Sequence, residues 1–291
     1  MKAAVQKLFC LECKACSSLI NFQRHVKLTC QDRKVGDNTR VNQTTSFSNS
    51  WVVRPRPNPQ ARLRLFCFPY AGGGASAFYA WVNNLPRNVE LCPIQLPGRQ
   101  GRLDVPPFTR MEALLDALVP VIRPYLDRPF AFFGHSLGAK IGFELARRLR
   151  AEGDPMPVHL FLSGSNAPQI AGPESPIHDL PDAELVEKLR RFAGTPEALL
   201  ENEDLLRVFL PTLRADIALH DTYRYVPEEP LDCSLSAFGG LEDAVVSRDN
   251  LEAWRVHTRG AFTLRMFPGD HFFLRGARMP LLRAIFRGLR L

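Results

Sequence analysis

Short apolar runs alternate with segments of helical periodicity along most of this chain. The runs are rich in Phe, Leu and Val, which is typical of strands buried on both faces of a sheet. They occupy residues 63–68, 89–96, 130–133, 158–162, 234–238 and 262–267. Because parallel strands need long crossovers between them, the alternation predicts an α/β fold with a mostly parallel central sheet and helices on both faces.

The alternation stops between Ser165 and Asp232. No strand pattern occurs there, and helical patterns cover about 180–192, 196–201 and 203–222. Residues 171–232 are also acidic, with 14 Asp and Glu against six Lys and Arg. We interpret residues 168–230 as a helical lid insertion, and an ordinary solvated helical hairpin is the alternative.

Two further helices are marked by their sequences. Thr109 and Glu112 have the spacing of a capping box, which predicts a helix that runs to about Tyr125. The last helix, residues 280–289, has an apolar stripe with arginines between its members. A basic amphipathic helix can bind a membrane, but a short helix that ends a domain usually packs on its sheet, so we expect no membrane binding.

The first 50 residues differ from the remainder. Residues 1–60 hold ten Lys and Arg and three Asp and Glu, which accounts for the whole formal net charge of +7, whereas residues 61–291 hold 27 of each. The folded part is therefore neutral, and we expect no nucleic-acid partner. Residues 33–50 are polar without a clear period, which favours disorder. We expect residues 1–50 to be a disordered or spurious extension and residues 51–291 to form the domain.

Four cysteines in that extension have a spacing that could bind zinc. They are Cys10, Cys13, Cys16 and Cys30, with His25 nearby. The polar stretch that follows them argues against a folded metal site. We expect no metal here, and a zinc site is the alternative.

No window of the chain resembles a membrane span. An uninterrupted run of 18 apolar residues is absent from the sequence. Charged residues near the N-terminus, such as Glu12 and Lys14, interrupt the apolar region that a secretory signal needs. We therefore expect a cytoplasmic protein.

The stretch Gly134-His135-Ser136-Leu137-Gly138 is a G-x-S-x-G pattern. A predicted strand precedes it and a predicted amphipathic helix follows it, which is the context of a nucleophile elbow. Glycines are needed there because a side chain would collide with the neighbouring strand or helix. The pattern predicts Ser136 as a catalytic nucleophile, and a structural Gly-Ser turn is the alternative.

A glycine-rich loop, residues 71–76, follows the first predicted strand. Such a loop can bind phosphate, but this one lacks the lysine of G-x-x-x-x-G-K-[ST] and does not fit G-x-G-x-x-G. We therefore expect no nucleotide and no other cofactor. In a serine hydrolase the same position supplies one N–H group of the oxyanion hole. We assign Ala71 and Leu137 as the two donors.

The remaining catalytic residues follow from chain order, which in this fold is Ser, then acid, then His. His257 falls in or beside a predicted helix, whereas His271 lies in a loop just past the last predicted strand. Asp243 follows a strand by a short loop, where the acid is expected. Glu242 and Asp270 are the alternatives, and Asp270 would have to fold back on its own neighbour. We assign Asp243 and His271 to a triad with the elbow serine.

Five short motifs in the predicted domain are specific in combination. They are Phe68-Pro-Tyr-Ala-Gly-Gly-Gly-Ala-Ser76, Leu96-Pro-Gly-Arg99, Phe133-Gly-His-Ser-Leu-Gly138, Leu213-Arg-Ala-Asp216 and Gly269-Asp-His-Phe-Phe273. With them the chain resembles the type II thioesterases, stand-alone enzymes of nonribosomal peptide, polyketide and fatty acid synthesis. The resemblance runs from about Trp51 to the C-terminus and covers none of residues 1–50.

This resemblance implies a fold, an activity and a partner. The fold is that of the α/β-hydrolases with a helical lid. The activity is hydrolysis of acyl thioesters on the phosphopantetheine arm of an acyl- or peptidyl-carrier protein, which clears misprimed or stalled synthases. The family's Ser, Asp and His fall on Ser136, Asp243 and His271, and its oxyanion donors fall on Ala71 and Leu137. We expect a monomer, and a small-ester carboxylesterase or lipase with the same triad is the alternative function.

Overall fold

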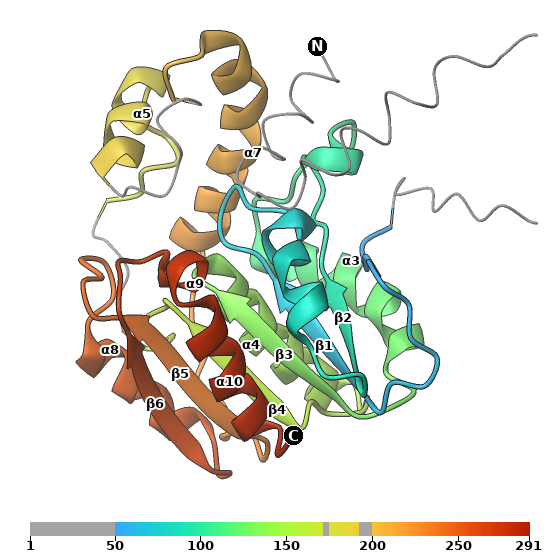
Figure 1. Cartoon of the computed structure of the whole chain (residues 1–291). Helices are drawn as coiled ribbons and strands as arrows, with labels where there is room; N and C mark the ends of the chain where they lie inside the picture. The colour runs from blue at the N-terminus through green and yellow to red at the C-terminus, as the bar shows by residue number, and fades with distance from the viewer. Residues whose placement is uncertain (1–49, 171–174, 192–199) are drawn as a thin grey trace, which may run out of the picture. The chain divides into compact units, whose positions relative to one another are not determined.

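Six parallel strands form the central sheet of the part of the chain that the structure, a computed structural model, describes: residues 50–170, 175–191 and 200–291 (Figure 1). Their order is β2-β1-β3-β4-β5-β6, and every neighbouring pair is parallel. The strands are β1 (Leu63–Phe68), β2 (Val89–Pro93), β3 (Phe130–His135), β4 (His159–Ser163), β5 (Ser234–Gly240) and β6 (Phe262–Phe267). The predicted α/β architecture is confirmed. The predictions for Cys10, Cys13, Cys16, Cys30 and His25 lie outside the described residues.

Helices cover both faces of the sheet and bury an apolar cluster on each. One cluster includes residues of α3 (Met111–Ile122), α4 (Leu137–Ala151), α8 (Arg248–Glu252) and the 3-10 helix η5 (Ala253–His257). The other includes residues of the 3-10 helix η2 (Ala75–Asn84), α9 (Phe273–Gly276) and α10 (Arg278–Gly288). Successive strand residues alternate between the clusters, as Phe132 and Phe133 of β3 do. The sheet is therefore buried on both sides, as its near-continuous apolar strands predict.

The start of α3 differs from the prediction. The N-cap is Arg110, which makes no capping side-chain hydrogen bond, and the helix begins at Met111. The Thr109 carbonyl instead accepts a hydrogen bond of 3.2 Å from Thr222 Oγ1. The capping box is therefore wrong, because Thr109 precedes the cap and is bonded to the end of another helix. The α-helix also ends at Ile122 and continues as the 3-10 helix η4 (Arg123–Tyr125).

A helical insertion lies between β4 and β5. Its described helices are α5 (Asp182–Arg191) and α7 (Glu203–Asp221), and no strand occurs among its described residues. The insertion has an apolar cluster of its own, formed by Leu185, Val186, Leu189, Leu200, Leu210, Leu213 and Ile217. Most of the helix predicted at 196–201 lies outside the described residues.

The C-terminal helix packs on the sheet, as expected. Leu281, Leu282 and Ile285 of α10 are fully buried in the second cluster. At the β2 edge, Val52 forms an isolated antiparallel bridge with Ile94. None of the described helices is both long enough and apolar enough to cross a membrane.

Candidate active site

Ser136 lies in the tight turn between β3 and α4 with φ 54° and ψ −118°. This is a sparsely populated backbone conformation that costs about 1–3 kcal/mol. The Ser136 N–H donates to the Ser163 carbonyl over 2.7 Å. A Cβ atom on Gly134 would overlap the backbone of Gly138, and one on Gly138 would overlap the Phe68 carbonyl. The turn therefore has the geometry of a nucleophile elbow, held by close packing that only glycine allows at both positions.

The structure brings Asp243 and His271 together. Asp243 Oδ2 lies 2.8 Å from His271 Nδ1, and the Asp243 side chain is fully buried. Asp243 Oδ1 accepts hydrogen bonds from the N–H groups of Val245 (2.8 Å) and Val246 (3.0 Å). Burial of Asp243 opposes its charged form, but the bond from His271 and the two backbone donors outweigh it and hold the Asp243 pKa below its usual value. An ionised Asp243 thus orients the imidazole.

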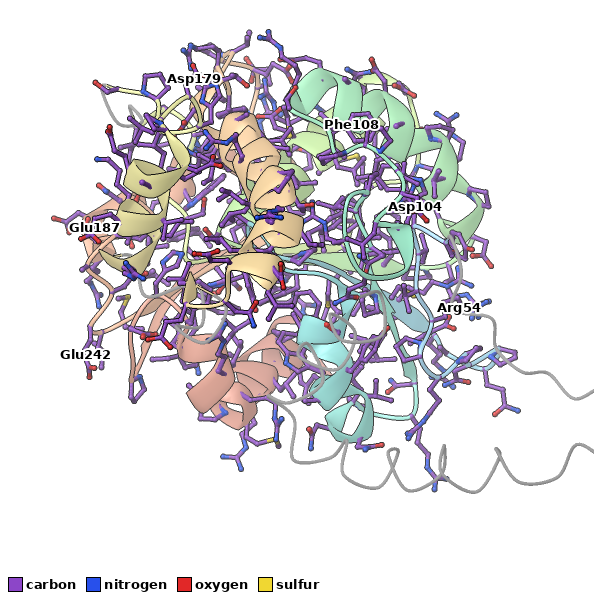
Figure 2. The ribbon with its side chains drawn as sticks, turned by 90° about the horizontal axis from the view of Figure 1, so that it is seen from above. Arg54, Asp104, Phe108, Asp179, Glu187 and Glu242 are labelled. Carbon is purple, nitrogen blue, oxygen red and sulfur yellow. The ribbon has the colours of Figure 1, made fainter. Side chains whose placement is uncertain are left out.

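The alternative residues lie elsewhere. Glu242 is exposed at the rim of the described unit (Figure 2), and its N–H donates to the loop that carries His271. The exposed Asp270 carboxylate accepts from the Phe272 N–H over 2.7 Å. His257 lies in η5 and contacts Gln169. Burial there lowers the His257 pKa to about 4.

The His271 ring lies beside the end of β4. A Cβ atom built on Gly164, whose φ is +56°, would stand 3.3 Å from His271 Cε1. Gly164 directly follows Ser163, whose carbonyl holds the Ser136 N–H. The candidate histidine and the candidate nucleophile therefore both lie beside the carboxyl end of β4.

His135, the second residue of the elbow motif, packs against Ser163 and His271. It is fully buried, its Nδ1 lies 2.9 Å from Ser163 Oγ, and its ring centroid is 5.2 Å from that of His271. Burial, together with the neighbouring His271 imidazole, holds the His135 pKa well below its usual value, against a raising contact with the His271 backbone. His135 is therefore a neutral packing group. The motif marks its position but not this role.

The two predicted oxyanion donors come from separate segments. Leu137 is the first residue of α4, so its N–H has no acceptor within the helix and lies at the positive end of the helix dipole. Ala71 lies in the loop after β1, and the part of the chain that the structure describes offers its N–H no hydrogen-bond acceptor. The close approach of Gly138 to the carbonyls of Phe68 and Pro69 packs the elbow against that loop.

Sequence reasoning missed one buried ion pair near this loop. Arg99 Nη1 lies 2.6 Å from Asp216 Oδ2, and Arg99 Nη2 lies 2.7 Å from Asp216 Oδ1. The two residues are 117 positions apart, so no local pattern could pair them. Both residues belong to motifs that carry the family resemblance, and this membership is the one sequence feature that could have drawn attention to them.

Among the described residues, no group of three or more His, Cys, Asp or Glu side chains is arranged to hold a metal ion.

Residues 63–289 match the family model of the thioesterase domain. This chain belongs to the thioesterase family. The protein is a thioester hydrolase with an α/β-hydrolase fold. Its resemblance to the type II thioesterases is confirmed by solved structures of that class, such as BorB.

Individual relatives agree with the family. The chain is 45% identical to the gramicidin S biosynthesis protein GrsT of Aneurinibacillus migulanus, over 84% of this chain and 95% of that protein. It is 39% identical to the thioesterase PikA5 of Streptomyces venezuelae, over 78% of this chain and 81% of that protein. The solved structure of the type II thioesterase BorB from the borrelidin biosynthetic cluster superposes with a TM-score of 0.74 at 36% identity, covering 84% of this chain and 97% of that one.

Proposed function

We propose that this protein is a stand-alone serine thioesterase that hydrolyses acyl thioesters from the phosphopantetheine arm of carrier proteins. In this role it clears misprimed or stalled synthases. The catalytic residues are Ser136, Asp243 and His271, and the oxyanion hole is formed by the N–H groups of Ala71 and Leu137. No cofactor takes part.

One observation carries this proposal: the buried Asp243 carboxylate binds His271 Nδ1 over 2.8 Å, at the end of the sheet where Ser136 occupies a strained elbow. The bond fixes the tautomer, because Nδ1 keeps its proton and Nε2 is left as the base. Each residue comes from a different loop at the carboxyl ends of the strands. This is the arrangement that the Ser, acid, His order of the fold requires.

The reaction follows from these roles. His271 takes the Ser136 proton while Ser136 Oγ attacks the thioester carbonyl. The tetrahedral oxyanion receives hydrogen bonds from Ala71 and Leu137, and the thiol leaves with the proton from His271. Water, activated by the same histidine, then releases the acid from the serine. A thiol leaves more readily than an amine, and in this proposal no metal takes part.

Carrier-bound substrates are supported by the relatives. GrsT is a gramicidin S biosynthesis protein, and BorB belongs to the borrelidin biosynthetic cluster. We infer an acyl- or peptidyl-carrier protein as the partner and the cytoplasm as the location, and we expect a monomer. The helical insertion, α5 and α7, acts as the lid of the site in this proposal.

Ser136→Ala tests the nucleophile. We expect kcat for an acyl thioester to fall on the order of 10⁴- to 10⁶-fold, as in other serine triads, while circular dichroism shows an unchanged fold. Ser165→Ala is the matched control, because Ser165 lies just beyond β4 and, among the described residues, its hydroxyl donates one long hydrogen bond, to the neighbouring Asn166 carbonyl at 3.5 Å. Retention of more than about a tenth of the activity by Ser136→Ala would contradict the assignment.

Substrate class is tested separately with one acyl group on two leaving groups. We expect kcat/KM to be higher for the carrier-bound thioester than for a simple ester of the same acid. The reverse order would favour the small-ester carboxylesterase or lipase, which uses the same triad.

A further inference from the structure

The glycine-rich loop after β1 is held by buried side chains from two distant segments. Asp216 of α7 accepts the Gly72 N–H over 2.7 Å. Arg99, in the loop after β2, donates to the Gly73 carbonyl over 3.0 Å. Gln95 accepts the Ala75 N–H over 2.9 Å. The backbone on the C-terminal side of Ala71 is therefore fixed by these side chains together with one turn hydrogen bond, in which the Gly73 N–H donates to the Tyr70 carbonyl over 2.8 Å.

Arg99 and Asp216 act on this loop as one unit. They form two hydrogen bonds with each other and are 4% and 1% exposed. Asp216 Oδ2 is shared, since it accepts from both Arg99 Nη1 and the Gly72 N–H. Loss of either charge would leave the other charge buried without its partner. Without Asp216, the Gly72 N–H would lose its acceptor, and without Arg99, the Gly73 carbonyl would lose its donor.

Helix α7 also contacts the loop through packing. A Cβ atom on Gly72, whose φ is +74°, would stand 2.5 Å from Phe209 Cζ and 3.2 Å from Leu213 Cδ1. Phe209, Leu213 and Asp216 are spaced by four and three positions and lie on one stripe of the helix. In Figure 1, α7 reaches from the helical insertion to the loops at the end of the sheet.

We propose that Arg99 and Asp216 are a positioning pair that ties the helical insertion to the oxyanion hole and sets the direction of the Ala71 N–H. The proposal rests on the proposed function. The Gly72 N–H belongs to the peptide group that follows Ala71, so anchoring it limits rotation of the Ala71 backbone. The Ala71 N–H itself stays available for the oxyanion.

This role has a kinetic signature. An oxyanion donor interacts more strongly with the tetrahedral intermediate than with the ground-state carbonyl, so its displacement lowers kcat more than it raises KM. Misplacement by about 1 Å can cost on the order of 100-fold in rate. If the pair were purely structural, its removal would lower the melting temperature without lowering kcat more than it raises KM.

The test uses the full chain and an acyl thioester of N-acetylcysteamine, at a temperature where circular dichroism shows each variant folded. Asp216→Val removes the shared oxygen but leaves Arg99 buried and unpaired, so it is destabilised and is not interpreted alone. The double variant Arg99→Met with Asp216→Val removes both charges and should recover most of the lost stability. Glu90→Gln is the matched control, because Glu90 forms a buried pair with Arg64 that does not touch the loop.

We expect the double variant to show kcat reduced about 10- to 100-fold with KM changed less than about threefold, and Glu90→Gln to keep kcat within about threefold. A double variant that recovers kcat together with its melting temperature would overturn the positioning role. A fall in kcat as large in Glu90→Gln would also overturn it. If Ser136→Ala stays active, the proposed function fails instead, so the two failures are distinguishable.

Discussion

At the residue scale, the elbow depends on two glycines, Gly134 and Gly138, where no side chain fits. The Gly138 backbone lies so close to the carbonyls of Phe68 and Pro69 that a methyl group there would force the elbow away from the oxyanion loop. The sequence predicts this requirement directly, because G-x-S-x-G places glycines on either side of the serine.

Gly138→Ala should therefore lower stability by about 1–3 kcal/mol and lower activity as well. For a domain of this size, that corresponds to a fall in Tm of roughly 2–12 °C. Gly276→Ala is the control, since among the described residues a Cβ atom built there has no neighbour within 4 Å beyond the adjoining residues and backbone of its own helix. Differential scanning calorimetry of the two variants checks the prediction, and equal Tm values would contradict it.

The sequence predicts some features of the candidate site but not the contacts between distant segments. Chain order and loop position favour Asp243 over Glu242 as the catalytic acid, and this stays a prediction; in the structure, Asp243 Oδ2 lies 2.8 Å from His271 Nδ1. The environment of His135 and the pairing of Arg99 with Asp216 depend on tertiary contacts between distant segments. Local patterns contain no information on such contacts.

At the element scale, strands were easier to predict than helix ends. All six apolar runs correspond to strands, because a parallel sheet buried on both faces leaves continuous apolar sequence. Ends depend on single hydrogen bonds, so the predicted second strand is too long and the predicted cap of α3 is wrong. Helix type is also difficult to predict, because periodicity over so few residues does not distinguish the 3-10 helix η2 from an α-helix.

The start of α7 provides a prediction for the helical insertion. Asn202 is the N-cap, and its side chain accepts the Leu205 N–H over 3.0 Å. Asn202→Ala should cost about 1 kcal/mol and speed amide hydrogen exchange about fivefold in the first turns of α7.

The same substitution should leave exchange in the central strands unchanged. Ser247→Ala, which removes the corresponding cap of α8, is the control and should affect only that helix. If Asn202→Ala accelerated exchange throughout the sheet, α7 would be part of the global folding unit rather than a separately opening element.

At the scale of the whole molecule, buried histidines make stability depend on pH. Burial lowers the pKa of His159, and likewise that of His257, to about 4. The unfolded chain takes up these protons below about pH 6.5, whereas the folded protein does so only near pH 4. The contribution of these two histidines to stability should be level above pH 7 and fall as the pH drops from about 6.5 to about 4, by up to about 1.4 kcal/mol per pH unit for each histidine.

His159→Asn tests this dependence. His159 stacks on Phe161 with ring centroids 4.1 Å apart, and its Nε2 lies 2.8 Å from Ser236 Oγ. The variant should be less stable than the wild type at pH 7.5, and the difference should shrink as the pH falls toward 4.5. Urea unfolding at several pH values measures this, and parallel curves would contradict the prediction.

Residues 1–49 also bear on the whole molecule. Ser50–Leu291 form a compact unit of their own, and the family match begins at residue 63. We predict that a protein that begins at Ser50 has the same Tm and the same kcat/KM as the full chain. Stoichiometric zinc in the full chain, with activity lost on chelation, would contradict this and would give the four cysteines a function.

The strand order has a consequence for synthesis on the ribosome. Each strand that emerges can pair with one already present: β2 and then β3 join β1, and β4, β5 and β6 follow outward one by one. Formation of the nascent sheet therefore does not depend on a central strand that has yet to be synthesised. Phe78 and Trp81 share a cluster with residues of α10, so a nascent chain exposes that apolar face until α10 has emerged. Chaperone contact during translation should concentrate on this face.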